Sequence, residues 1–409
     1  MSRHYSPKDF FRQTPKKVLA RFFEARGVLA DFDFTAIKDG KSDALFAAWL
    51  MLPDAERKPI DTVFSEIFDM SCEKGFKAIL AEAPYQFKDQ PEKIPEFVDV
   101  LAAVPNHFER AMTTYLDYPN FWKAAIRFYH ADTLSSHWRK RKNLPHKVAA
   151  VDPASIAKLA EAIGGYFHYK EGRGKNCAVE PYRRDTLDYF FAFPEDYSQQ
   201  EPEWVNDEFK SRPHTPAFEV IFIYSQQDGS LDIHYQGSYK AIQPLQTMFA
   251  AIVLGLDELP PDPKDERVYE LGPLLQRNFD FAPAIGSGID SIVLKKLRLS
   301  SRVKKGERIT LEADTSNDPK AIYVLLDKIG KSTPLHLYNV TQVELSASVV
   351  MDDKPPKNVP IRITHPNSCS LKYDELDHRL RDMLADAGIE LKEPEEDTQV
   401  PAATEPVEA

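Results

Sequence analysis

The stretch that decides the fold class is Phe218-Glu219-Val220-Ile221-Phe222-Ile223-Tyr224, then Ser225-Gln226-Gln227-Asp228-Gly229-Ser230, then Leu231-Asp232-Ile233-His234-Tyr235. The first and last segments are rich in β-branched and aromatic residues, and an Asp-Gly pair lies between them. Because glycine supplies the positive φ that tight hairpin turns need, this pattern predicts two antiparallel strands. An amphipathic helix is expected over 239–254, so the sequence indicates an α+β fold.

On the N-terminal side of the hairpin, the sequence predicts one helix and two more strands. Asp152-Pro153 is a strong helix start, since an acidic N-cap precedes a proline in the first turn. Strands are expected over 176–182 and 186–193. Region 148–275 is therefore predicted as helix, four strands and helix, which favours an antiparallel sheet with helices on one face.

The flanking regions complete the predicted architecture. Residues 1–147 carry apolar side chains at helical spacing and predict an all-helical domain. Residues 276–390 predict a second α+β unit in the order ββαββα, again with about four antiparallel strands and helices on one face. Residues 391–409 mix acidic residues with prolines and alanines, which predicts an acidic disordered tail.

Composition excludes several classes of protein. The 409-residue chain has a formal net charge of −11, which disfavours a purely electrostatic nucleic-acid binder. The longest apolar run, 248–256, is too short to span a bilayer, and the start has no run of signal-peptide length, so a cytoplasmic protein without membrane contact is expected. Three widely spaced cysteines predict small buried hydrophobes rather than a disulfide framework.

The densest basic cluster follows a helix that is predicted over 120–135. It comprises a tryptophan and four consecutive cations: Trp138, Arg139, Lys140, Arg141 and Lys142. Such a cluster can meet a phosphate backbone while the indole stacks on a base. More commonly it is a solvated helix C-terminus, where cations complement the negative end of the helix dipole. Both interpretations stay open from the sequence.

A second group of cations lies on the strands of the last unit. If Leu297, Leu299, Ile361 and Ile363 face the helices, alternation directs these cations to the opposite face: Lys296, Arg298, Arg302 and Arg362. A partly basic face of this kind suits nucleic acid. Glu312, Gln342 and Glu344 are expected on the same face, however, so cross-strand ion pairing explains the charges without a ligand.

The sequence contains no Gly-x-Ser-x-Gly elbow, no His-Glu-x-x-His helix and no Cys-x-x-Cys pair. One unpatterned set of residues supplies oxygen and imidazole ligands for a divalent metal, provided that neighbouring strands bring it together: Glu180, Asp188, Glu219, Asp232 and His234. Charged residues on strands usually face water, so catalysis by this set is an alternative hypothesis. No cofactor is expected.

These features together predict a noncatalytic cytoplasmic binding or scaffold protein that works with protein subunits in a larger assembly and engages nucleic acid. The predicted contacts are the basic cluster at 138–142 and the basic strand face. One alternative is a metal-dependent, nuclease-like hydrolase that uses the middle sheet. The other is a module that binds only other proteins.

Overall fold

The computed structural model describes residues 4–205, 208–261, 267–351 and 354–391. By compactness the chain divides into two units. The first contains the chain up to Leu134 together with Ala149–Ser225, and the second contains Ser135–Val148 together with the chain from Gln226 onward. This division differs from the domain boundaries expected from the sequence, because the segment 135–148 joins the C-terminal unit. The predicted tail lies outside the described residues from 392 onward.

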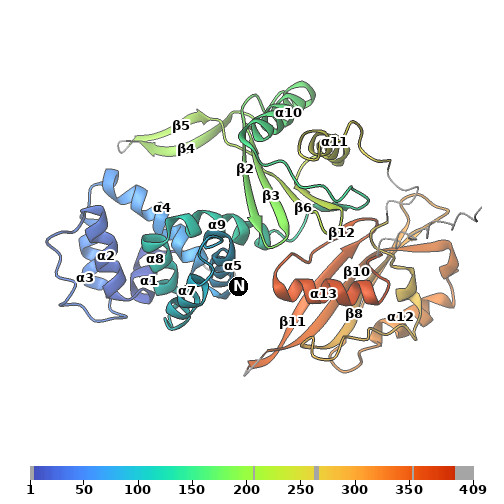
Figure 1. Ribbon diagram of the computed structural model, residues 1–409. Coiled ribbons are helices and arrows are strands. Elements are labelled where there is room, and N and C mark those ends of the chain that lie inside the picture. The colour runs from blue at the N-terminus through green and yellow to red at the C-terminus, as the bar shows by residue number, and fades with distance from the viewer. Residues whose placement is uncertain (1–3, 206–207, 262–266, 352–353, 392–409) are drawn as a thin grey trace, which may run out of the picture. The chain divides into compact units, whose positions relative to one another are not determined.

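The N-terminal part of the first unit is helical, as the sequence predicts (Figure 1). Its helices are α1 (Pro7–Gln13), α2 (Lys16–Arg26), α3 (Asp43–Leu50), α4 (Asp54–Met70), α5 (Glu73–Ala81), α6 (Ala83–Gln86), α7 (Lys93–Ala102), α8 (His107–Asp117) and α9 (Pro119–Thr133). Phe64 of α4 lies in the middle of an aromatic core, with the rings of Phe10 and Phe22 each 4.7 Å from its own. Burial of such rings is the main stabilising contribution in a helical layer.

The rest of the first unit contains helix α10 (Pro153–Glu171) and strands β2 (Cys177–Arg184), β3 (Leu187–Pro194) and β6 (Val220–Ser225). Asp152 caps α10 as predicted, since one carboxylate oxygen accepts from the backbone N–H groups of Ala154 and Ser155 at 3.1 and 3.0 Å. β3 pairs antiparallel with β2 on one side and β6 on the other, and α10 packs on β2 and β3. The helix-on-sheet expectation is confirmed here.

Strands β4 (Gln199–Val205) and β5 (Glu208–His214) form a separate two-stranded sheet that the sequence reasoning missed (Figure 1). Their residues are mostly charged or polar, and each strand contains a proline. Composition of this kind is depleted in β-sheets, so the usual strand signal is lacking.

The second unit begins with the basic cluster, which forms strand β1 (Trp138–Arg141). The interpretation as a solvated helix end is therefore wrong, because α9 ends at Thr133 and Leu134 is already extended. β1 pairs antiparallel with β7 (Ser230–Tyr235), which places Lys140 opposite Asp232 and Trp138 opposite His234. The backbone hydrogen bonds of a strand ladder thus replace those of a helix.

Both β-runs of the opening stretch are strands, β6 and β7, and the boundary between the two units falls in the turn that separates them. Gly229 in this turn has φ +54°, and a Cβ there would lie 2.3 Å from the carbonyl oxygen of Leu144. Glycine is therefore required at this position for two reasons: it adopts the positive φ, and it leaves room for the backbone of Leu144. Helix α11 (Ile242–Ile252) follows a 3₁₀ turn at Tyr239–Ala241, close to the expected range.

The largest sheet of the second unit has five antiparallel strands in the order β12-β11-β10-β8-β9. The strands are β8 (Ile289–Ser301), β9 (Arg308–Glu312), β10 (Tyr338–Met351), β11 (Lys354–Thr364) and β12 (Ser368–Cys369), with helices α12 (Ala321–Gly330) and α13 (Glu375–Asp386) and 3₁₀ turns at Gly272–Leu275 and Leu335–Leu337. Leu297, Leu299, Ile361 and Ile363 are fully buried, which confirms the predicted inward row. The short β12 adds a strand to the four that were expected.

Composition led to two expectations, one about membrane-spanning helices and one about the three cysteines, and they have different outcomes. Within the described ranges, no helix is long and apolar enough to cross a bilayer. The three cysteines are free thiols, but only Cys369 is buried. Cys72 and Cys177 are half-buried, so the prediction of three buried cysteines is wrong for these two. Cys72 instead caps α5, because its sulfur accepts from the backbone N–H of Gly75 at 3.4 Å.

Candidate functional site

The basic cluster at 138–142 lies in the interior of the second unit. Trp138, Lys140 and Arg141 are each no more than 5% exposed. Arg139 is half-buried, donates to the Trp138 carbonyl at 2.8 Å and lies 5.7 Å from the Tyr239 ring. Trp138 is therefore not placed to stack on a base, and the cations beside it do not form a continuous exposed patch.

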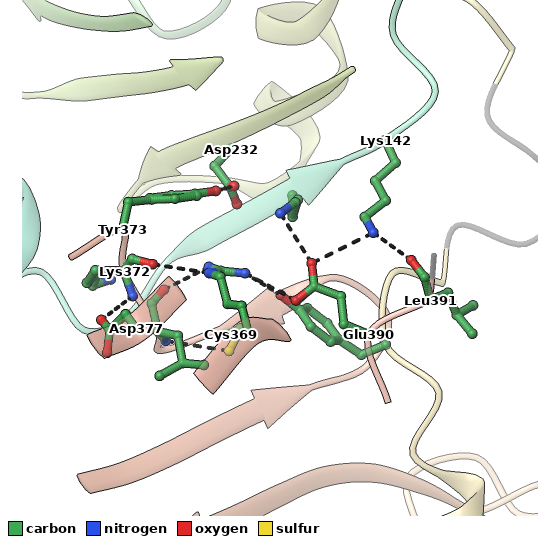
Figure 2. A network of polar contacts seen from close by, with 12 residues as sticks. Lys142, Asp232, Cys369, Lys372, Tyr373, Asp377, Glu390 and Leu391 are labelled. Carbon is green, nitrogen blue, oxygen red and sulfur yellow. Dashed lines mark hydrogen bonds and ion pairs between the residues drawn. The ribbon is translucent and has the colours of Figure 1, made fainter. Parts of the chain in front are cut away.

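Glu390 is the carboxylate on which this cluster converges (Figure 2). Its oxygens lie 3.2 Å from Lys140 Nζ, 3.7 Å from Lys142 Nζ and 3.4 Å from Arg381 Nη1. Burial by itself would raise the pKa of Glu390, but the cations of Lys140, Arg381 and Lys142 outweigh it and lower that pKa to about 2. Glu390 is therefore ionised at neutral pH and compensates several buried positive charges.

The remaining contacts of the cluster also occupy its cations. Lys142 Nζ donates to the Leu391 carbonyl at 2.5 Å, as Figure 2 shows. Arg141 donates to Gln246 Oε1 at 3.3 Å and to the carbonyl of Pro260. Buried cations of this kind need such partners, because an uncompensated charge in the interior is costly.

Asp232, which lies opposite Lys140, and Lys372, which lies near Trp138, extend the network along the same face of β1. The Tyr373 hydroxyl donates to Asp232 (Figure 2), and burial raises the pKa of that carboxyl despite the nearby cations of Lys140 and Arg381. Lys372 Nζ lies 4.7 Å from the Trp138 ring and has no hydrogen-bond partner among the described residues. Burial lowers the pKa of Lys372 to about 8, although the charge of Asp232 opposes the shift.

The proposed metal ligands are occupied by other contacts. In the first unit, Glu180 accepts from Arg127 at 2.8 Å, Glu219 lies 2.8 Å from His130, and Asp188 lies 3.4 Å from Arg183. Asp188 is the cross-strand partner of Arg183, so these two side chains point to the same face of the sheet. Glu180 lies three residues from Arg183 on β2, and side chains three residues apart on a strand point to opposite faces. Glu180 and Asp188 therefore lie on opposite faces of the sheet.

Asp232 and His234 belong to the second unit, where His234 packs against Trp138 with 5.1 Å between ring centroids. Both side chains are buried, as is every other residue of β7. The assumption that polar strand residues face water is therefore wrong for this strand. Among the described residues, no group of three or more His, Cys, Asp or Glu side chains is arranged to hold a metal ion.

The predicted basic strand face divides into paired and unpaired cations. Glu344 lies opposite Lys296 on one side and Arg362 on the other, and Lys296 lies opposite Glu312. Lys296 Nζ is 2.9 Å from Glu312 and Arg362 Nη2 is 3.3 Å from Glu344. These two cations therefore belong to an alternating row of cross-strand ion pairs, as the simpler interpretation predicts.

A group of cations surrounds the turn between β8 and β9, and we call it the basic hairpin tip: Arg298, Arg302, Lys304, Lys305 and Arg308. No described carboxylate forms an ion pair with any of its three arginines. Burial and the charge of Arg308 both lower the pKa of Arg298. The one carboxylate in the turn, Glu307, pairs with Lys304 at 3.3 Å and accepts from the Tyr338 hydroxyl.

Hydroxyl groups lie beside these arginines. Arg298 donates to Thr341 Oγ1 at 3.4 Å, and the hydroxyls of Thr341 and Ser300 are 2.8 Å apart. Thr310 pairs with Arg298, and Arg308 pairs with Ser300. Guanidinium groups with neighbouring hydroxyls are suitable donors for phosphate oxygens.

The sequence reasoning identified Arg298 and Arg302 but missed Lys304, Lys305 and Arg308. The signal was available, since the turn Arg302-Val303-Lys304-Lys305-Gly306 is basic and follows an amphipathic strand. Tyr373, Arg381 and Glu390 were also missed as partners of the cluster at 138–142. No local pattern distinguishes Glu390 from the other acidic residues near the C-terminus.

No protein-family model matches this sequence, and a search of curated proteins finds no significant match.

Proposed function

We propose that this protein is a noncatalytic cytoplasmic binding protein that engages nucleic acid through the basic hairpin tip and works within a larger assembly. One observation carries the proposal: Arg298 and Arg308 lie diagonally across the β8–β9 pair, Arg302 directly follows the end of β8, and no described carboxylate forms an ion pair with any of them. Nearby cations on a sheet normally acquire acidic partners, as Lys296 and Arg362 have done.

The chemistry of the tip favours the phosphate backbone over the bases. Arginine binds phosphate oxygens through two parallel N–H groups, and the Ser300 and Thr310 hydroxyls add neutral donors. The described tip contains no aromatic side chain on which a base could stack, except Tyr338, which is engaged with Glu307. Binding of this kind is weakly selective for sequence and steeply dependent on salt.

The proposal separates the tip from the cluster at 138–142, whose Lys140 and Arg141 are buried. The hydrolase alternative remains a hypothesis that rests on sequence alone, with no supporting cluster among the described residues. Substitution of Asp232 and His234 by alanine, followed by assays of metal-dependent cleavage of DNA and RNA, tests it.

Fluorescence anisotropy with labelled 30-nucleotide single strands and duplexes, at 50 and 200 mM salt, tests the proposal. We expect the double variant R302Q/R308Q to bind more weakly than the wild type. The slope of the logarithm of the binding constant against the logarithm of the salt concentration should fall in magnitude by about 2, since each phosphate contact contributes about 1. The matched control K158Q/K170Q removes two exposed cations from α10 and changes the net charge equally.

We expect the control to bind as the wild type does. Equal weakening by both double variants would show that only net charge matters, and binding that is absent or insensitive to salt in the wild type would overturn the proposal.

A further inference from the structure

The ribbon of β4 and β5 has one apolar face and one charged face. The antiparallel register pairs Trp204 with Phe209, Pro202 with Ser211 and Gln200 with Pro213. The intervening pairs carry the charges: Glu201 with Arg212 and Glu203 with Lys210. Because successive side chains of a strand point to opposite faces, the first set shares one face and the second set shares the other.

The apolar face is strongly exposed. Trp204 is 66% exposed and Phe209 is 64% exposed, although their rings pack on each other with 5.5 Å between centroids. Tryptophan is enriched at protein interfaces, and an exposed contiguous pair of aromatic rings is a candidate binding surface. Figure 1 shows the two strands as a ribbon of their own. A two-stranded ribbon is marginally stable in water, so a partner would contribute to its stability.

The charged face, by contrast, is neutralised within the ribbon. Arg212 pairs with Glu203, Lys210 lies 2.5 Å from Glu208, and His214 lies 3.2 Å from Glu201. The described ribbon has three carboxylates against two permanent cations, Lys210 and Arg212, so it does not attract a polyanion. This balance favours a protein partner over nucleic acid.

The ribbon edges are unsuited to pairing with another strand. Pro202 interrupts the donors of β4, and Pro213 interrupts those of β5. Proline on an exposed edge is a common protection against strand addition. Recognition therefore has to use the apolar face.

The size of that face distinguishes a second copy from a different protein. At two-thirds exposure the two aromatic residues offer roughly 200–300 Å² together, since a large aromatic residue buries about 150–250 Å². A stable interface needs about 800 Å² from each partner. Two such faces packed against each other would be too small, whereas the walls of a cleft in a different protein also contact the edges of the ribbon and leave its charged face in solvent.

We propose that the β4–β5 ribbon is a docking arm that inserts Trp204 and Phe209 into an apolar cleft of a different protein. The inference goes beyond the proposed nucleic-acid contact and uses other residues, so the two can fail independently. Aromatic anchors in a desolvated cleft typically dominate binding, while paired charges on the opposite side contribute little.

The first test places the photocrosslinking residue p-benzoylphenylalanine at position 204, or at position 201 on the charged face, in cells that produce the protein. We expect one protein to be crosslinked from position 204 and not from position 201. That protein is then purified and titrated with the full-length chain.

The affinity test compares W204S/F209S with the matched control E201Q/R212Q, which removes one charge of each sign from the opposite face. We expect W204S/F209S to weaken binding at least about a hundredfold, and E201Q/R212Q to stay within about threefold of the wild type. Circular dichroism of both variants checks that removal of the Trp204–Phe209 cross-strand contact leaves the fold intact.

Several results would overturn the proposal. Crosslinking of position 204 to a second copy, together with a dimer that W204S/F209S dissociates in light scattering, identifies self-association instead. A crosslink to nucleic acid, no crosslink at 204, or equal loss of affinity in both variants also rejects the docking arm.

Discussion

The two basic clusters of the second unit have similar composition and opposite surroundings. Lys140 and Arg141 of β1 are buried, and the carboxylate of Glu390 compensates the charge of Lys140. Arg302 and Arg308 of the hairpin tip are exposed instead. The difference arises from long-range contacts, since Lys140 and Glu390 are 250 residues apart. A run of cations in a sequence is therefore weak support for a binding surface until its carboxylate partners are known.

Of the variants considered, removal of the carboxylate shared by the buried cations should change the free energy of unfolding most. In Glu390→Gln, the cations of Lys140, Lys142 and Arg381 lose their common counter-charge inside the protein. We expect about 3–5 kcal/mol of destabilisation in urea unfolding, as for other buried pairs that lose one partner. The control Glu375→Gln breaks an exposed pair with Arg379 and should cost less than about 1 kcal/mol.

The same variant has a pH signature. The pKa of Glu390 is about 2 in the fold against 4.5 for an ordinary glutamate, so its ionised form stabilises the fold above about pH 4.5. That contribution is lost as the pH falls from about 4.5 to 2. The stability difference between the wild type and Glu390→Gln should therefore shrink across this window, and a constant difference would contradict the assigned role.

Removal of the buried amine of Lys372, which lies near the Trp138 ring, should have the second largest effect. The pKa of Lys372 is about 8 in the fold and 10.5 in an ordinary lysine, so the unfolded chain holds this proton more firmly. The fold therefore carries a penalty below about pH 8, which disappears as the pH rises from 8 to 10.5. Lys372→Met removes this penalty but also removes the cation–π contact with Trp138, which partly offsets the gain. We expect a net stabilisation of about 1–2 kcal/mol at pH 7.

Chemical unfolding at pH 7, 8.5 and 10 measures this effect, with Lys328→Met on the exposed side of α12 as control. The advantage of Lys372→Met should decline toward pH 10, while the control stays close to the wild type throughout. Destabilisation of Lys372→Met at pH 7 would show that its ammonium group is stabilising where it lies.

The smallest change in stability is expected from the exposed cross-strand ion pairs of the five-stranded sheet. Lys296→Gln removes the cation between Glu312 and Glu344, whose side chains are partly solvated. We expect a loss of about 0.2–1 kcal/mol in 50 mM salt and less in 500 mM salt, because exposed pairs are screened. A loss that is independent of salt would indicate a packing role for the lysine stem.

The sequence predicted the fold where local chemistry determines it. The apolar runs around Gly229 and the alternation at Leu297 and Leu299 identify strands close to their true ends, since burial and turn formation depend on neighbouring residues. Strand β1 and the ribbon were missed, because pairing with a distant strand overrides the polar composition in one case and prolines conceal the signal in the other.

The candidate sites were predictable to a smaller extent. Arg298 and Arg302 were identified by alternation, but which cations find a carboxylate depends on strand register. The burial of Lys140 depends on Glu390, whose position follows only from the complete packing of the unit. Sequence patterns report periodicity within a segment and carry little information on such long-range partners.

The distance along the chain between Lys140 and Glu390 also affects how the protein emerges from the ribosome. Translation adds about 5–20 residues each second, so the lysine waits roughly 12–50 s before its glutamate is made. During that interval the nascent segment Trp138–Arg141 has a tryptophan and three cations without their final partners. A chaperone that shields basic, aromatic segments would be most useful in this period, and a chain that terminates before residue 390 would lack the common counter-charge of Lys140, Lys142 and Arg381.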